Sequence, residues 1–427
     1  MAPNIITRAL YALTLALALT SADTIDLNLD QALTIALKNG PLQGEIAASR
    51  IQGITSFGEG INALLPAATA SFFSVTQEGN PNLWKGDITI QQVLFDPSVF
   101  ASLINSIINA DYYSCEVKDK TARLLCDVTT DYLNLLKAQL LFDASRKTLE
   151  QAKEEKRLTT ERFRLGQISR IDLLRSEVFY TQAQLGLFSA EKNLINAQEM
   201  FKATAGINQP LFIRATEQIS SPPEWQITDP DSLLILIERT NPNRKMAQKL
   251  STIAGINLTS TLCRLLPSVS LYRTWGYSDT LFPFFSSYKE KSSITQGIRI
   301  SLPVDIKAII LNIGDALAGS KRARATLAKT RLQLRATAGI AIAGYEEAKT
   351  RYEQAKRNLE LNKELEELAL TQYRLGALPF VELLEVQANL AQAEATYLAA
   401  LCDTYIQLAQ IGYLLGKTAP IKSIFPK

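Results

Sequence analysis

The sequence predicts a mainly α-helical protein with a small β portion, built from two copies of one half-length unit. Three observations lead to this fold class. The segment Phe163-Arg164-Leu165-Gly166 recurs 210 residues later as Tyr373-Arg374-Leu375-Gly376. A run of 68 residues, 98–165, contains neither glycine nor proline. Each half also contains two short segments of β-strand character, and in the clearest of them apolar and polar residues alternate.

The internal duplication extends well beyond these two turns. Asp172-Leu173-Leu174 corresponds to Glu382-Leu383-Leu384, and Gly206 corresponds to Gly416, at the same offset of 210. Further upstream the offset is 201, so the second copy carries a short insertion. Each copy is far longer than a solenoid repeat, which indicates a tandem duplication of a half-protein and one pseudo-symmetric object.

Residues 1–22 are interpreted as a secretory signal peptide. Arg8 precedes the run 9–19, which is apolar apart from Thr14, and small residues follow for cleavage. This run is too short to span a bilayer, although a short membrane anchor is the alternative interpretation. After residue 22 no stretch of 18 residues is apolar and uncharged, so any membrane insertion is expected to use strands.

Composition argues against several function classes. The formal net charge is +3 without a basic stripe, which gives no reason to expect a nucleic-acid partner. The chain has no histidine, no G-x-S-x-G, no P-loop and no metal-ligand cluster, so we expect neither an enzyme nor a cofactor or metal site. The cysteines have no zinc-site spacing and are interpreted as small packing residues: Cys115, Cys126, Cys263 and Cys402.

In the first half, 23–205, an amphipathic helix over 26–39 precedes a second helix that begins near Pro41. Two strands are predicted at about 68–76 and 86–96. The run without glycine or proline then forms a helix of roughly 100 Å. Gly166 ends this helix, so the hairpin tip is at about 164–168 and the return helix continues to residue 205.

The second half, 231–416, repeats this order after a linker at 206–230 that contains Pro210, Pro222 and Pro223. Two helices over 231–239 and 243–266 precede strands at about 268–277 and 293–302. A long helix over 305–373, a tip at about 374–379 and a final helix to residue 415 complete the half. Residues 417–427 are predicted to be a tail.

Strands of this length suit a tilted crossing of a bilayer. In the last one, Ile294, Ile298 and Ile300 alternate with mostly small polar residues, so one face could contact lipid and the other water. Aromatic residues gather around the strand connections, as at a membrane interface: Trp84, Trp275, Tyr277, Phe282, Phe284, Phe285 and Tyr288. Four strands cannot close a barrel, so it must be shared by three chains (twelve strands) or four (sixteen). A soluble sheet with one hydrophobic face is the alternative.

The duplication, the element order and the doubled Arg-Leu-Gly turns resemble the TolC-like family of outer-membrane efflux and secretion channels, over nearly all of the chain after residue 22. The resemblance implies a homotrimer with a trimeric α-barrel and a 12-stranded transmembrane β-barrel. It implies the outer membrane of a Gram-negative-type bacterium, with an extension into the periplasm. The expected function is a passive exit channel for tripartite efflux or type I secretion, which docks to a periplasmic adaptor and an inner-membrane pump or ABC transporter.

The resemblance also implies roles for particular residues. Arg164, Leu165 and Gly166, with Arg374, Leu375 and Gly376, match the adaptor-contact turns; plain hairpin turns are the alternative. Asp172 and Tyr373 match positions that bond across the closed gate, while the family's gate arginine is replaced by Leu378. Glu382 and Glu385 share one helical face and match the acidic pair at the channel mouth. Three copies would form a ring of carboxylates that attracts cations, whereas the alternative is two ordinary surface glutamates.

A second function class fits part of the pattern. A periplasmic coiled-coil adaptor or tether would also have a secretion signal and a long helical hairpin. Such proteins usually carry one hairpin, without the duplicated hairpins and paired strands predicted here, and they have no barrel.

Overall fold

The computed structural model describes residues 24–76, 83–209, 211–216, 229–279, 292–302 and 306–418. The predicted signal peptide lies outside these residues, as do the three linker prolines and four of the predicted aromatic residues, Phe282, Phe284, Phe285 and Tyr288. The described residues are mainly helical with a small β portion, which confirms the predicted fold class at this level.

The chain divides into two compact units. Unit 1 comprises residues 1–45, 118–241 and 335–427, and unit 2 comprises residues 46–117 and 242–334. Each unit draws segments from both halves of the sequence, and the two longest helices contribute to both units.

Unit 1 has a small core around a two-stranded parallel sheet. Strand β1 (Thr24–Leu27) pairs with β4 (Phe212–Ala215), and helix α2 (Leu29–Asn39) begins with a capping box between Asn28 and Gln31. The Tyr132 hydroxyl donates to the Leu27 carbonyl at 2.8 Å, and the Tyr132 ring meets the Phe201 ring edge to face at 5.9 Å between centroids. Tyr132 and Phe201 are fully buried, so they fix β1 against the long helices.

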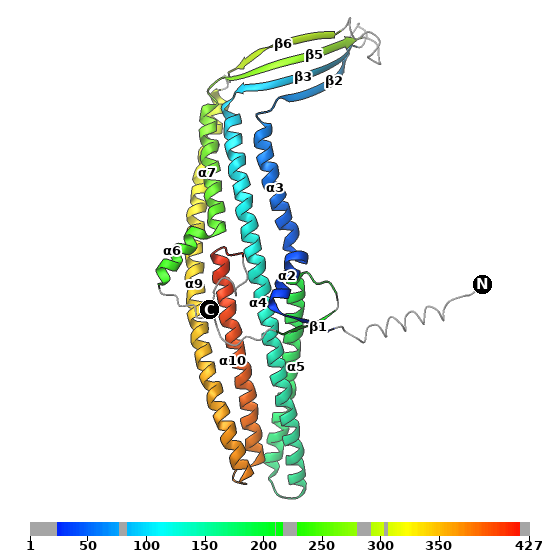
Figure 1. Ribbon diagram of the computed structural model, residues 1–427, viewed down its shortest axis with the longest axis vertical. Helices are drawn as coiled ribbons and strands as arrows, with labels where there is room; N and C mark the ends of the chain where they lie inside the picture. The colour runs from blue at the N-terminus through cyan, green and yellow to red at the C-terminus, as the bar shows by residue number, and fades with distance from the viewer. Residues whose placement is uncertain are drawn as a thin grey trace, which may run out of the picture. The chain divides into compact units, whose positions relative to one another are not determined.

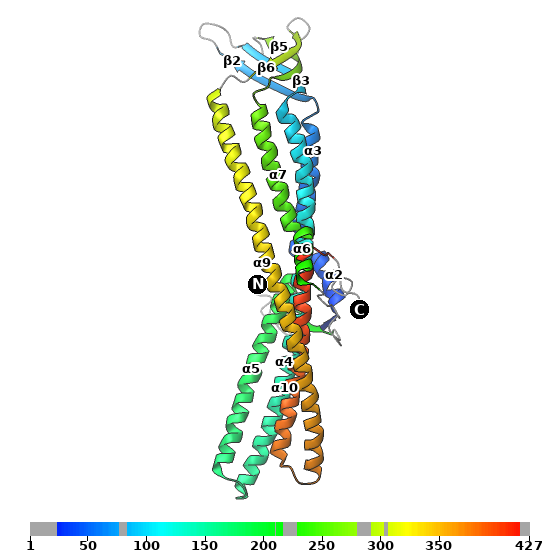
Figure 2. The same ribbon diagram turned by 90° about the vertical axis from the view of Figure 1, so that its left-hand side faces the viewer.

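Two helical hairpins supply most of unit 1. The first consists of α4 (Pro97–Arg164) and α5 (Arg170–Ala205), and the second consists of α9 (Ile306–Arg374) and α10 (Phe380–Leu414). Figures 1 and 2 both show the two members of each hairpin running side by side to a short turn. Helix α6 (Pro230–Thr240) begins at Asp229, whose side chain caps two backbone amides.

Unit 2 contains the four-stranded antiparallel sheet, most of helix α3 (Leu42–Asn62) and all of α7 (Pro242–Cys263). The strands are β2 (Ala67–Val75), β3 (Leu83–Phe95), β5 (Ser268–Asp279) and β6 (Ser292–Ser301), in the spatial order β2-β3-β5-β6 (Figure 1). All four lie close to their predicted ranges. Strand β3 begins three residues earlier than predicted, because Leu83 and Trp84 pair with Val75 and Ser74 of β2.

The sheet has two chemically different faces. The register aligns Ile88 of β3 with Trp275 of β5 and Ile294 of β6, and this face is largely apolar across all four strands. On the opposite face Thr89 and Thr274 share a hydrogen bond of 2.9 Å. Period-2 alternation therefore produces the apolar and polar faces that the sequence pattern predicts.

Among the residues that the structure describes, no helix combines the length and apolar character of a membrane span. The four cysteines are free thiols. Burial raises the pKa of Cys126 and of Cys402 to about 12, so both thiols stay neutral at ordinary pH and fit a packing role.

Candidate functional site: the tips of the two helical hairpins

The first hairpin turns through a Schellman motif. The Gly166 amide donates to the Phe163 carbonyl at 3.0 Å, and the Gln167 amide donates to the Arg162 carbonyl at 2.9 Å. Gly166 has φ +72°, a left-handed conformation that glycine adopts without the steric cost of a Cβ. The glycine therefore ends α4 and reverses the chain within a few residues.

The second hairpin turns in the same way. The Gly376 amide donates to the Tyr373 carbonyl at 3.0 Å, and the Ala377 amide donates to the Gln372 carbonyl at 2.9 Å. Gly376 has φ +73°. The doubled Arg-Leu-Gly sequence thus produces two turns with the same hydrogen-bond pattern.

Both tips present a leucine to the surface. In the chain by itself Leu165 is 69% exposed and Leu375 is 78% exposed, although leucine is among the residues most often buried. Arg164 and Arg374 are exposed beside them. Each tip therefore combines an apolar side chain with a cation on a hydrogen-bonded turn, which is suited to contact with another protein.

The two hairpins differ at the start of the return helix. Ser169 caps α5, and its hydroxyl accepts from the Asp172 amide at 3.2 Å while the Asp172 carboxylate accepts from the Ser169 hydroxyl at 2.7 Å. In the second hairpin the capping position is Pro379, which has no side-chain cap bond. Glu382, which corresponds to Asp172, is exposed. Asp172 therefore has a structural role in capping α5, while Glu382 forms no such capping bond.

Glu385 is also exposed, one helical turn after Glu382 on α10. Burial raises the pKa of Glu155 on α4, and the nearby negative charge of Glu385 raises it further. The structure thus brings a third carboxylate, from the other hairpin, toward the predicted acidic pair. Sequence analysis missed Glu155, since no local pattern relates α4 to α10.

The remaining predicted gate residues lie at the second tip. Tyr373 is 41% exposed and is the last residue but one of α9. Leu378, at the position of the family's gate arginine, is half-buried in the turn.

Sequence analysis also gave no prediction of an ion-pair cluster that joins the two hairpins. Lys137 of α4 donates to the Asp403 carboxylate of α10 at 2.7 Å, and a guanidinium nitrogen of Arg351 on α9 lies 3.9 Å from the same carboxylate. Asp403 thereby connects three helices. The signal in the sequence is one acidic residue within an otherwise uncharged stretch of α10, which is weak evidence by itself.

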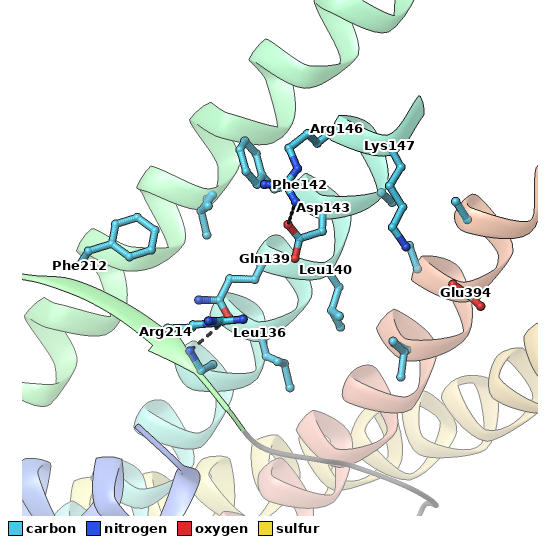
Figure 3. A pocket seen from close by; sticks show the side chains of 16 residues that line it. Leu136, Gln139, Leu140, Phe142, Asp143, Arg146, Lys147, Phe212, Arg214 and Glu394 are labelled. Carbon is cyan, nitrogen blue, oxygen red and sulfur yellow. Dashed lines mark hydrogen bonds and ion pairs between the residues drawn. The ribbon is translucent and has the colours of Figure 1, made fainter. Parts of the chain in front are cut away.

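Unit 1 also contains a cavity of about 720 Å³ bounded by α4, α5, β4 and α10. Figure 3 shows Arg146 and Lys147 from α4, Arg214 from β4 and Glu394 from α10 around it. Both charge signs line this cavity, so its electrostatics select no single class of ligand. In the part of the chain that the structure describes, no group of acidic and cysteine side chains is arranged to hold a metal ion.

No protein-family profile matches this sequence, and no curated protein sequence matches it. Solved structures do match. The CmeC outer-membrane channel of Campylobacter jejuni aligns with a TM-score of 0.74 at 17% identity, over 91% of this chain and 85% of CmeC. The open state of the MtrE outer-membrane channel of Neisseria gonorrhoeae aligns with a TM-score of 0.71 at 17% identity, over 91% of this chain and 89% of MtrE.

The outer-membrane protein VceC of Vibrio cholerae aligns with a TM-score of 0.70 at 13% identity, over 91% of this chain and 96% of VceC. These neighbours are TolC-like outer-membrane channels, so the predicted resemblance is confirmed at the level of the fold.

Proposed function

We propose that this protein is the outer-membrane exit channel of a tripartite efflux or type I secretion system. Three copies form a passive conduit, with a 12-stranded barrel in the outer membrane and a tunnel of α-helices in the periplasm. Energy comes from an inner-membrane pump, to which the channel is joined by a periplasmic adaptor. The fold shared with CmeC, MtrE and VceC supports this assignment.

The observation that carries the proposal is the four-stranded sheet with one apolar and one polar face. On the apolar face Ile294, Ile298 and Ile300 are 60%, 64% and 69% exposed, which is unfavourable in water and suitable against lipid. In the sheet that the structure describes, β2 and β6 are the edge strands, so each has one side without a partner strand. Pairing between β2 of one copy and β6 of the next satisfies those groups and closes a barrel.

The tips supply the docking surface and the entrance. Leu165 and Leu375 contact the adaptor, while the adjacent Arg164 and Arg374 orient it by charge. Glu382 and Glu385 form an acidic ring at the channel mouth, and Asp172 and Tyr373 contribute to its closure. The carboxylates attract cations and repel anions at the narrowest part of the conduit.

Single-channel conductance in a planar bilayer tests this function, together with the mass of the detergent-extracted protein by light scattering. We expect a trimer with cation-selective conductance. A matched pair of variants tests the sheet: Ile298→Arg places a charge on the apolar face, and Thr295→Arg places one on the polar face. The first is expected to destabilise the inserted state by about 2–4 kcal/mol if it lies near the bilayer midplane, and the second to leave insertion unchanged.

A water-soluble monomer without conductance would contradict the proposal and favour the adaptor-like alternative. Equal effects of the two arginine variants on insertion would contradict the assignment of the faces.

A further inference from the structure

The strands of the four-stranded sheet do not all start at one level. Ala67, the first residue of β2, is in register with Tyr272 of β5 and Gly297 of β6. Strands β5 and β6 nevertheless continue for four residues beyond this level on the side that joins the helices, to Ser268 and Ser301. The helix-side end of the sheet therefore shifts by four residues between β2 and β6.

This shift has the size that closure into a barrel requires. In a 12-stranded barrel whose strands are tilted by about 35–45°, the pairing is staggered by roughly 12–17 residues over one full turn. Three identical copies each contribute a third of that stagger, which is about four to six residues. The stagger per copy must be even, because an odd value would exchange the two faces of the sheet. The shift within the chain meets both conditions.

This stagger gives a register between neighbouring copies. With the helix-side strand ends of all copies at one level, Ser301 of β6 is opposite Ala67 of the next copy, and β2 pairs with β6 along its whole length. The same stagger in the other direction would leave most of β2 without a partner strand. The first register places Gly297 of one copy opposite Ser71 of the next, both on the polar face.

Tyr272 extends over β6 toward this junction. Gly297 lies directly opposite Tyr272 and has no side chain, so the Tyr272 ring occupies the space above it. A Cβ at Gly297 would lie 3.3 Å from the Tyr272 hydroxyl and 3.5 Å from two of its ring carbons. The hydroxyl therefore lies over β6, at about one strand spacing, ~4.8 Å, from the strand that carries Ser71 in the next copy.

The charges on the two sides of the junction are complementary. The Arg299 guanidinium carbon lies 4.8 Å from the Tyr272 ring centroid, and the Ser71 hydroxyl donates to the Asp87 carboxylate at 2.6 Å. Among the residues that the structure describes, neither Arg299 nor Asp87 forms an ion pair. Within one chain they are far apart, because Asp87 is in register with Ser293, about 20 Å along β6 from Arg299.

We propose that neighbouring copies are joined by a polar contact inside the barrel, in which Tyr272 and Arg299 of one copy bind Ser71 and Asp87 of the next. This inference rests on the proposed function, because it requires three copies that share one barrel. The Tyr272 hydroxyl donates to the Ser71 oxygen, whose own hydrogen is donated to Asp87, and the Asp87 carboxylate balances the Arg299 charge. The contact repeats at each junction and fixes the register of β2 against β6.

Cysteine pairs test the register in the detergent-extracted trimer, in a background whose four native cysteines are replaced by alanine. Each pair shares Thr295→Cys on β6. Phe73→Cys of the next copy is opposite it at the proposed stagger, Thr69→Cys at no stagger, and Val75→Cys at a stagger of about six residues. We expect mild oxidation to link copies mainly through the Phe73 pair, because only directly opposite residues bring their Cβ atoms within disulfide range. Predominant linkage through Thr69 or Val75 would overturn the proposed register.

Double-mutant cycles test the contact itself. Arg299→Gln and Asp87→Asn are each expected to speed heat dissociation of the trimer about tenfold, and the double variant about as much as either alone, because both remove the same charged contact. Tyr272→Phe and Ser71→Ala should likewise be non-additive. The matched control is Arg273→Gln. Arg273 has a similar cation–π geometry on the opposite face of the sheet, so its effect should add to that of Asp87→Asn.

Additive effects of Arg299→Gln and Asp87→Asn would overturn the contact, because the two side chains are too far apart to interact within one chain. Conductance of the wild-type protein separates the two proposals. A wild-type trimer that conducts, together with additive variants or linkage in another register, contradicts this inference alone. Wild-type protein that neither forms a trimer nor conducts contradicts the channel function itself.

Discussion

Glu154 and Glu155 are adjacent on α4, and their environments shift their pKa values in opposite directions. A hydrogen bond from Arg157 lowers the pKa of Glu154, while burial and the charge of Glu385 raise the pKa of Glu155. The raised pKa means that ionisation of Glu155 is less favourable in the folded protein than in the unfolded chain. Its contribution to stability is therefore greatest in acid and is lost as pH rises through the folded pKa.

We expect Glu155→Gln to raise the thermal unfolding midpoint at pH 7 and to have little effect at about pH 3.5, where the carboxyl is protonated in both states. Glu154→Gln is the control. Its folded pKa is lowered, so its contribution is present at neutral pH and lost in acid, and its removal should lower the midpoint slightly at pH 7. Far-UV circular dichroism of the detergent-extracted protein measures both. A lower midpoint for Glu155→Gln at pH 7 would contradict the raised pKa of Glu155.

The acidic pair on α10 makes a prediction about permeation. Glu382→Gln combined with Glu385→Gln removes six negative charges from the proposed trimer mouth, so the cation-to-anion permeability ratio should fall toward one. Reversal potentials in a salt gradient measure that ratio. The control is Glu353→Gln with Glu360→Gln. These two glutamates are exposed on α9 at a distance from the tip, so their removal should leave the permeability ratio unchanged. Unaltered selectivity in the α10 variant would indicate that Glu382 and Glu385 are ordinary surface residues.

The helices and their turns follow closely from local sequence. All the glycines with positive φ in the described residues are Gly166, Gly206, Gly376 and Gly416, which are two pairs at the offset of 210. Each ends a long helix at a position where an L-residue is strained. The turns were therefore predictable, because a left-handed helix end depends on a few neighbouring residues.

Three glycines of the first hairpin should respond differently to alanine. Gly166→Ala should destabilise by about 1–2 kcal/mol through its positive φ alone, since a Cβ there meets open space. Gly206→Ala should cost about 2–5 kcal/mol, because its Cβ would also overlap the backbone of Asn39. Gly186→Ala, on an exposed and open site within α5, should stabilise by roughly 0.5–1 kcal/mol.

Thermal unfolding midpoints of the three alanine variants provide the comparison. A destabilising effect of Gly186→Ala as large as that of Gly166→Ala would contradict the assignment of the cost at Gly166 to its backbone conformation.

At the scale of the whole molecule, the exposed tips predict how the proposed channel would dock to the proposed adaptor. Leu165→Asp or Leu375→Asp should abolish cross-linking to the periplasmic adaptor and leave the trimer intact, because an acidic group cannot replace the apolar contact. Leu165→Met and Leu375→Met preserve volume and apolar character and should retain cross-linking. Normal cross-linking in both aspartate variants would contradict the docking role and indicate that the tips are simple hairpin turns.

Helix bounds, hairpin tips and the two faces of each strand follow from the amino-acid sequence, because they depend on neighbours within about four residues or on a period of two. The order β2-β3-β5-β6 does not, since β3 and β5 pair across about 185 residues of sequence, as the Thr89–Thr274 bond shows. The approach of Glu385 to Glu155 and the Lys137–Asp403 contact likewise depend on how α10 packs against α4. Such contacts join side chains that no local sequence pattern relates, so only the tertiary structure determines them.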